Sequence, residues 1–194
     1  MRRQLPAGDV LLLLSPSAVA VLLAVNGTSG LSAQLFHSTL GVWRDVQLPT
    51  GADPKRPLAD VYVAFSADGQ WLFTRDRDGR TRAFEATRAL PADSAKELGI
   101  LSGEPLEDPR DPVLWLCLPQ GVFVVGLDGQ KVQRDAAPCD PTLTIFTDAS
   151  FVYRSAQTLR ATPLAGGPAR TLSDDPQLAQ VLTIKALDGA EHVV

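Results

Sequence analysis

The amino-acid sequence predicts an all-β protein built from repeated antiparallel units. Tight-turn signals recur along the chain at Asn26-Gly27, Asp78-Gly79, Asp128-Gly129 and Asp188-Gly189. Asn or Asp followed by Gly suits short hairpin turns because these residues tolerate positive φ angles. The segments between the turns are short and are either apolar or alternate with a period of two, as strands do. The 15 glycines and 15 prolines among 194 residues also favour turns over long helices.

The first predicted unit covers residues 8–49. Its second strand ends at a hairpin signal, and its last strand alternates apolar and polar residues, as a half-exposed edge strand does. The four strands of this unit are expected at Leu11–Leu14, Val19–Val25, Leu31–His37 and Trp43–Leu48.

The start of the chain has an alternative interpretation, in which residues 1–20 are a signal peptide. Two arginines near the N-terminus precede the apolar run Val10–Val25, which is the order of charge and apolarity in such a leader. Asp9 before the run and Ser15-Pro16-Ser17 inside it favour two strands and a turn instead. The run is also shorter than the ~20 residues that span a bilayer.

The second predicted unit covers residues 58–86 and follows a proline-containing linker. Val61, Val63 and Phe65 alternate along its first strand, and Trp71 and Phe73 alternate along its second. The plan of the first unit is therefore repeated, with strands joined by tight turns.

Residues 87–111 are predicted to be an insertion because they show little period-two pattern. Within them, Ser94-Ala95-Lys96-Glu97 has the spacing of a capping box and Gly99 suits a helix end. One helical turn is therefore expected in this insertion.

Three further units are expected, and the last of them is incomplete. Irregular spacing combined with a constant internal plan favours repeats with loops of different length, such as propeller blades, over a strict solenoid. We therefore predict one β-propeller-like domain over residues 1–194, an array of about four to five antiparallel blades of three or four strands. The further units are expected at residues 112–135, 141–173 and 180–194.

The stretch around residues 61–85 resembles a repeat of the TolB-type, WD-repeat-like β-propellers. Phe65-Ser66-Ala67-Asp68-Gly69, then Trp71-Leu72-Phe73, then Asp76–Arg80 carry the resemblance. Ala67 stands where the family usually has proline, and the third and fourth units lack the Ser-Pro-Asp-Gly turn. The resemblance implies an architecture, because the same blades occur in interaction proteins, periplasmic subunits and appendages of peptidases.

The length of the chain limits how such blades close. Blades of about 40–45 residues allow only about four to five in this chain, which is few for a closed ring. An open array exposes strand edges, and exposed edges pair with other chains. We therefore predict a small or partial propeller whose edges bind another protein or a second copy of the chain.

Charge excludes some partner classes. The formal net charge is −4, from 18 Lys and Arg against 22 Asp and Glu. This balance gives no basic footprint for nucleic acid or anionic lipid. We expect no nucleic-acid partner and no membrane insertion.

The cysteines and tryptophans are few. Cys117 and Cys139 lack the paired short spacings of a zinc site, so they are expected to be free thiols or to form one disulfide. Trp43, Trp71 and Trp115 are expected to pack in the core, unless one is exposed and anchors an interface.

A partial calcium-loop pattern falls on the hairpin of the second unit. Asp76, Asp78, Gly79 and Glu85 match four positions of the pattern, but Thr74 stands at the first ligand position. A charged hairpin turn is the favoured interpretation, and no metal or cofactor is expected.

Four arginines, Arg75, Arg77, Arg80 and Arg82, alternate with acidic residues along the same hairpin. A solvated face is the favoured interpretation. If these arginines bind a partner, an acidic protein surface is the expected one.

Candidates for catalysis are sparse. The chain has two histidines, His37 and His192, and a triad of His37, Ser38 and Asp45 is conceivable. A His and a Ser at a strand end are ordinary turn residues, so the chain is not expected to be an enzyme.

The sequence therefore predicts a non-enzymatic protein–protein interaction module or a structural subunit of a larger assembly. The alternative is a ligand-binding or hydrolytic propeller with a site in a central channel lined by inner strands. The channel-lining segments, at residues 11–14, 61–65, 113–118 and 143–146, are almost wholly apolar, so this alternative ranks second. A cytoplasmic location is expected, or a periplasmic or secreted one if residues 1–20 are a signal peptide.

Overall fold

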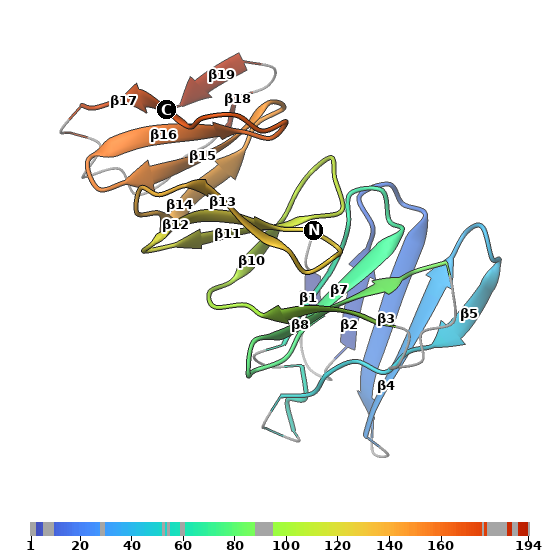
Figure 1. The fold of residues 1–194 in the computed structure, drawn as a ribbon. Helices are drawn as coiled ribbons and strands as arrows, with labels where there is room; N and C mark the ends of the chain where they lie inside the picture. Colours follow the sequence, from blue (N-terminus) through green and yellow to red (C-terminus); the bar gives the residue numbers. More distant parts are fainter. Residues whose placement is uncertain are drawn as a thin grey trace. The chain divides into compact units, whose positions relative to one another are not determined.

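The structure is a computed structural model that describes residues 3–5, 10–27, 30–51, 53, 55–58, 61–87, 95–175, 177, 186–187 and 190–193. The regular elements in this part of the chain are β-strands in separate antiparallel sheets (Figure 1). Strands that follow one another in sequence are neighbours within each sheet, which is the plan of propeller blades. The predicted all-β, propeller-like fold class is confirmed. None of the described segments is a helix long and apolar enough to cross a bilayer.

Sheet 1 has five strands in sequence order. The apolar run near the start of the chain forms two of them, β2 and β3, because the Ser-Pro-Ser turn interrupts it. The two-strand interpretation of this run is confirmed. The strands are β1 (Arg3–Leu5), β2 (Val10–Leu14), β3 (Ala20–Gly27), β4 (Gly30–His37) and β5 (Val42–Asp45).

Sheet 2 has four strands, again in sequence order. Its two predicted hairpin turns are present, with φ of +72° at Gly69 and +84° at Gly79. A residue with a side chain would be strained at both positions. The strands are β6 (Tyr62–Phe65), β7 (Trp71–Arg75), β8 (Arg80–Glu85) and β9 (Lys96–Ile100).

The helical turn expected at Ser94–Glu97 is wrong. Ser94 lies outside the described residues, and Lys96 and Glu97 begin β9, which pairs with β8. Leu98 is buried and its neighbours in β9 are exposed, so this edge strand buries a single side chain. Gly99 has a φ of +92° but lies opposite a register shift in β8, where it forms part of a strand irregularity instead of a helix end.

Sheets 3 and 4 each have four strands, and a two-stranded sheet follows them. The first strand of sheet 3, β10, also falls within the segment that was expected to be an insertion. The turn predicted at Asp188-Gly189 lies outside the described residues. Sheet 3 contains β10 (Pro105–Glu107), β11 (Leu114–Leu118), β12 (Gly121–Val125) and β13 (Lys131–Asp135). Sheet 4 contains β14 (Asp140–Phe146), β15 (Ser150–Ser155), β16 (Thr158–Pro163) and β17 (Arg170–Ser173), and the short sheet contains β18 (Ala186–Leu187) and β19 (Ala190–Val193).

The chain divides into two compact units, which we call lobe 1 and lobe 2. Lobe 1 contains sheets 1 and 2, and lobe 2 contains most of sheet 3 and all of sheet 4. Lobe 1 comprises Met1–Leu101, Glu107–Val113 and Gly126–Gln130, and lobe 2 comprises Ser102–Leu106, Leu114–Val125 and Lys131–Val194.

The core of lobe 1 is aliphatic apart from two phenylalanines, and it lies between sheets 1 and 2. Sheet 1 contributes side chains such as Leu13, Leu22 and Leu35, and sheet 2 contributes Phe65 and Leu72. All five are at most 5% exposed. One face of sheet 1 is therefore buried against an apolar face of sheet 2.

A hydroxyl group closes the turn after the first core strand in three of the blades. The residues are Ser15, Ser66 and Thr147, each directly after β2, β6 or β14. A side-chain oxygen that accepts backbone N–H bonds fixes such a turn, so the repeat is a structural one. The donors are the backbone N–H groups of Ala20 (3.0 Å), Trp71 (3.0 Å) and Ser150 (3.0 Å).

Candidate functional site

The segment predicted as a partial calcium loop is the turn between β7 and β8. Asp76 Oδ1 accepts hydrogen bonds from the backbone N–H groups of Asp78 (3.0 Å) and Arg80 (2.9 Å). A carboxylate that bonds the N–H two residues on forms an Asx-turn. This oxygen therefore holds the hairpin closed.

Glu85, the last residue of the calcium pattern, lies at the opposite end of β8, where it pairs with Trp71. A six-residue strand spans on the order of 17–20 Å, so Glu85 is far from the turn that contains Asp76 and Asp78. The structure does not bring these three carboxylates together. Among the described residues, no group of three or more His, Cys, Asp or Glu side chains could hold a metal ion.

The arginines of this hairpin occupy both faces of sheet 2. Arg75 pairs with Thr81 across the two strands, and Thr74 pairs with Arg82. Because paired residues share a face and successive residues alternate, Arg75 lies on one face and Arg80 and Arg82 lie on the other. The arginines do not form one continuous stripe.

Two of these arginines have structural partners within lobe 1. Arg75 Nε donates to the backbone carbonyl of Leu101 (3.1 Å), and Arg82 Nε forms an ion pair with Glu97 Oε1 (2.7 Å) that joins β8 to β9. Arg77 lies in the exposed turn, where its only ion pair among the described residues is with the adjacent, exposed Asp78 (3.6 Å). Arg77 and Arg80 thus remain the accessible members of the predicted set.

The conceivable catalytic residues of sheet 1 are not brought together. His37 is 1% exposed and lies on the core face of β4, and its Nδ1 accepts from the backbone N–H of Thr39 (3.3 Å). Asp45 pairs with Gln34, which is three residues from His37 and therefore on the opposite face. Asp45 Oδ1 accepts from Gln34 Nε2 (3.0 Å) instead.

The two cysteines form a disulfide within lobe 2. Cys117 lies in β11, and Cys139 lies in the segment between β13 and β14. Both are buried. Of the two possibilities left open by the sequence, the structure has the single disulfide.

A polar network links sheets 3 and 4 in lobe 2, and no sequence pattern indicated it. The Asp135 carboxylate accepts hydrogen bonds from the Tyr153 hydroxyl and from Arg160 Nε (2.7 Å). Tyr153 is fully buried, and Arg160 also donates to Thr171 Oγ1 (3.2 Å). The partners of Asp135 are 18 and 25 residues away in the chain, so only the sheet topology could have revealed them.

This network sets the ionisation of its members. Burial acts to raise the pKa of Asp135, but the hydrogen bonds from Arg160 and Tyr153 outweigh it and hold that pKa below its ordinary value. Burial, followed by the hydrogen bond to Asp135, raises the pKa of Tyr153 to about 12. At neutral pH the network therefore contains an ionised carboxylate, a neutral phenol and a guanidinium.

An apolar surface on sheet 1 is the candidate functional site, and we call it the Trp43 face. In the register of the sheet, Leu14 pairs with Val21, Val21 with Phe36, and Phe36 with Trp43. Paired residues share a face, so these four side chains form one row across β2, β3, β4 and β5. A second row contains Leu12, Leu23, Gln34 and Asp45.

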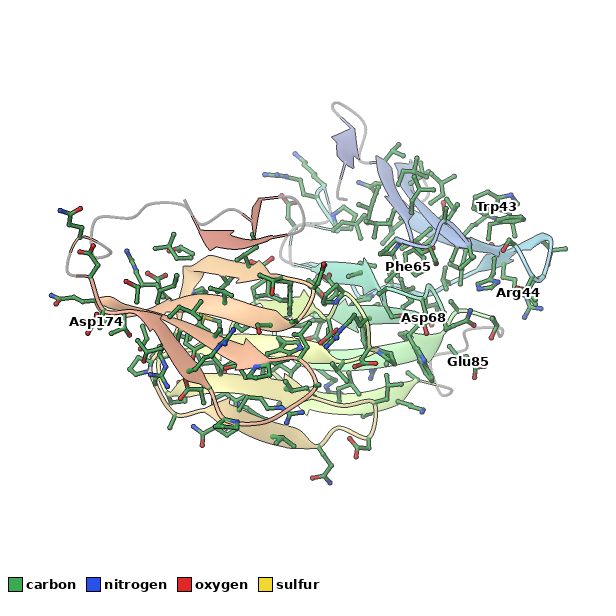
Figure 2. The ribbon with its side chains drawn as sticks, turned by 90° about the horizontal axis from the view of Figure 1, so that it is seen from above. Trp43, Arg44, Phe65, Asp68, Glu85 and Asp174 are labelled. Atoms are coloured by element: carbon green, nitrogen blue, oxygen red, sulfur yellow. A yellow bond between two sulfur atoms is a disulfide. The ribbon has the colours of Figure 1, made fainter. Side chains whose placement is uncertain are left out.

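The Trp43 face is opposite to the buried face of sheet 1. Leu14 is 54% exposed and Trp43 is 49% exposed, and the Trp43 ring lies against Phe36 with 5.4 Å between centroids. Figure 2 shows Trp43 and Arg44 on opposite sides of β5, with Phe65 of sheet 2 on the Arg44 side. Trp43 is therefore the exposed tryptophan that the sequence left as an interface candidate, while Trp115 is buried.

The comparisons with known proteins find similarity in solved structures only. No protein-family model and no curated protein sequence matches the chain. Structures similar to it include TolB and other propeller proteins, all at low identity and with weak superposition.

Three of these structures illustrate the level of similarity. TolB from Acinetobacter baumannii has 11% identity and a TM-score of 0.41, over 84% of this chain and 44% of that one. KlHsv2 with loop 6CD replaced by a Gly-Ser linker has 7% identity and a TM-score of 0.45, over 84% of this chain and 51% of that one. The computationally designed Ika8 protein has 11% identity and a TM-score of 0.45, over 96% and 64%. The chain thus spans about half the length of the first two.

Proposed function

We propose that this chain is a non-enzymatic protein-interaction module that acts as a subunit of a larger assembly. The observation that carries the proposal is the Trp43 face. Contiguous exposed apolar patches are uncommon on soluble proteins and mark sites of interaction. An exposed Trp beside a Phe is also the kind of side chain that anchors protein interfaces.

The residues on the outer edge strands indicate that a partner binds to a sheet face and does not pair with a strand edge. Exposed charged residues lie along them, such as Lys96 and Glu97 on β9, Lys131 on β13 and Arg170 on β17. Charged side chains on an edge strand oppose pairing with another strand. The partner is therefore expected to cover the Trp43 face.

The core strands support the non-enzymatic part of the proposal. Every residue of β6 and of β11 is buried, and all are apolar or aromatic. The histidine and carboxylate considered for catalysis, His37 and Asp45, lie on opposite faces of sheet 1. Nucleophilic catalysis requires such groups within hydrogen-bond reach of one another.

The disulfide supports a location outside the cytoplasm. Stable structural disulfides are rare in reducing compartments and common in the periplasm and in secreted proteins. Of the two locations considered from the sequence, we therefore propose the periplasmic or secreted one. This proposal rests on the disulfide and not on a signal peptide at residues 1–20, because the run that suggested one forms β2 and β3. Alkylation of unreacted thiols in the native cell, followed by mass spectrometry, should find Cys117 and Cys139 unlabelled until a reductant is added. Labelling of both without reductant would contradict this location.

The proposed function is tested by affinity capture with three forms of the full chain, after chemical cross-linking in the native source so that weakly bound partners are kept. Wild type and Ile100→Glu should retain the same protein, and Leu14→Glu should lose it. Leu14 and Ile100 are both exposed, at 54% and 74%, so neither substitution disturbs the core, and only Leu14 lies on the Trp43 face. Equal retention by all three forms, or no retained protein, would contradict the proposal.

A further inference from the structure

We infer that the Trp43 face is the interface of a twofold dimer, with a second copy of this chain as its occupant. This inference rests on the proposed function and names its partner. It depends on four properties of the described residues: where exposed apolar side chains gather, the charge of the face, what already covers an equivalent face, and which other faces are open.

Within the part of the chain that the structure describes, exposed apolar side chains gather on the Trp43 face and not elsewhere. Of the large apolar side chains that are more than about a third exposed, Leu12, Leu14 and Trp43 lie on this face. The others, on β9, β13, β17 and the opposite face of β5, are isolated. Isolated exposed apolar residues are normal, whereas a cluster on one sheet face calls for an occupant.

The charge of the face permits contact between two identical surfaces. Where the two rows cross β2 to β5, the charged residue is Asp45, which lies on the edge strand β5 with its carboxylate bonded to Gln34. The register continues the second row to Arg3 on β1, at the other edge of the sheet. Like charges buried against each other would oppose self-association. The central positions of the face, on β2 and β3, are Leu and Val, so two copies can meet without that cost.

Lobe 1 already shows what packs on a sheet face of this kind. The opposite face of sheet 1, with Leu13, Leu22 and Leu35, is buried by an apolar face of sheet 2 that includes Phe65 and Leu72. Two sheets packed face to face with interdigitated apolar side chains are a stable arrangement. The complement of the Trp43 face is therefore another apolar sheet face.

In a second copy of the chain, the apolar sheet face that is open for this contact is the Trp43 face itself. On the described faces of sheets 2, 3 and 4, the apolar side chains are mostly buried, for example Leu143, Val152 and Leu159 in sheet 4, and the exposed ones are isolated. A head-to-tail contact requires two different open faces, whereas a twofold contact requires one that meets itself. Among the described residues the Trp43 face is the open one, so self-association should be twofold and should stop at the dimer.

The size of the face sets the strength of the dimer. Four strands at ~4.8 Å spacing, with two rows that each take up ~7 Å along the strands, give about 250 Å² of flat area per copy. This is below the ~800 Å² of accessible surface per partner of a standard stable interface. We therefore expect a weak, reversible dimer that forms only at high protein concentration.

Sedimentation of the full chain between about 1 µM and 500 µM tests the inference. Wild type and Ile100→Glu should pass from monomer to dimer with similar Kd, and Leu14→Glu should raise the Kd at least tenfold because it places two carboxylates in the interface. A wild-type monomer throughout, species larger than a dimer, or an unchanged Kd in Leu14→Glu would overturn the dimer. If wild type is a monomer but the capture experiment above retains a different protein through Leu14, the dimer is overturned and the proposed function stands.

Discussion

The two lobes hold their sheets together by different means. In lobe 1, sheets 1 and 2 meet through a mainly aliphatic core. In lobe 2, Trp115 of sheet 3 packs against Phe146 and Phe151 of sheet 4, with ring centroids 6.0 Å and 5.2 Å away. The Asp135 network and the disulfide add polar and covalent links in lobe 2. The stability contributed by buried apolar surface depends little on pH or redox state. An ion pair, in contrast, is weakened when pH changes the charge of a partner, and a disulfide is lost under reducing conditions.

The lobes also differ in what they leave uncovered. Lobe 1 exposes the Trp43 face, while the apolar side chains of β11 and β15 in lobe 2 are buried. Lobe 1, whose sheets are held together by apolar packing, is thus the lobe with an exposed apolar sheet face. We interpret lobe 2 as the part that its polar network and disulfide stabilise, and we propose lobe 1 as the part that binds the partner.

The largest effect should come from removing the aromatic anchor of lobe 2. Trp115→Ala removes a side chain that is 1% exposed, and it should lower the free energy of unfolding by about 3–5 kcal/mol. Denaturant titration measures this. The matched substitution Trp43→Ala, on the exposed face, should cost less than about 1 kcal/mol in the monomer. Equal losses in the two variants would contradict the contrast between a core tryptophan and an interface tryptophan.

Opening the disulfide should have the next largest effect. Cys117 and Cys139 are 22 residues apart, and cross-linking a loop of that length stabilises a fold by about 3 kcal/mol. The variant with both cysteines replaced by Ala should show faster amide hydrogen exchange in β11 and β15, with β3 and β7 unchanged. Equal acceleration in both lobes would show that the lobes unfold as one unit.

The pH dependence should also separate the lobes. A carboxyl whose folded pKa is lowered contributes stability above its unfolded pKa of ~3.9, and this stability is lost as the pH falls through the folded pKa. Lobe 2 should therefore lose stability below about pH 4 through Asp135, and Asp135→Asn should reduce this loss. Tyr153, with its pKa raised to about 12, contributes stability that is lost as the pH rises from ~10 towards 12. Hydrogen exchange in β15 that is no more sensitive than β7 at either extreme would contradict this account.

The smallest effect is expected at the surface of lobe 1. Arg82 and Glu97 form an ion pair whose side chains are 33% and 54% exposed. Such pairs contribute ~0.2–1 kcal/mol, and salt screens them. A double-mutant cycle with Arg82→Ala and Glu97→Ala should find a coupling energy in that range that decreases at 1 M salt. A coupling above about 2 kcal/mol would mean that β9 depends on this pair more than on Leu98.

The sequence indicates the best-formed blade well, and the rest of the molecule less well. In sheet 2, the Asp78-Gly79 turn and the short apolar run Val61–Phe65 are local signals, and the strands follow them. β9 was missed because an outer edge strand needs only one buried side chain, Leu98, and therefore lacks a period-two apolar pattern. Its Lys96-Glu97 pair also fits a helix.

The candidate site was missed for a different reason. The strands β2 and β3 are apolar on both faces, so their sequence alone predicts strands that are buried on both sides. Only the register, which places Leu14 in one row with Trp43, and the position of sheet 2 on the other side show which face is open. The Asp135 network likewise joins residues from three strands that no local pattern connects.

Hydroxyl-radical footprinting of the full chain at low and high concentration tests the central claim most directly, because it reports the exposure of single side chains. If the Trp43 face is the interface, Leu14 and Trp43 should be oxidised several-fold more slowly at about 500 µM than at about 1 µM, while Ile100 and Val132 should not change. Protection of Ile100 or Val132 without protection of Leu14 and Trp43 would contradict the account.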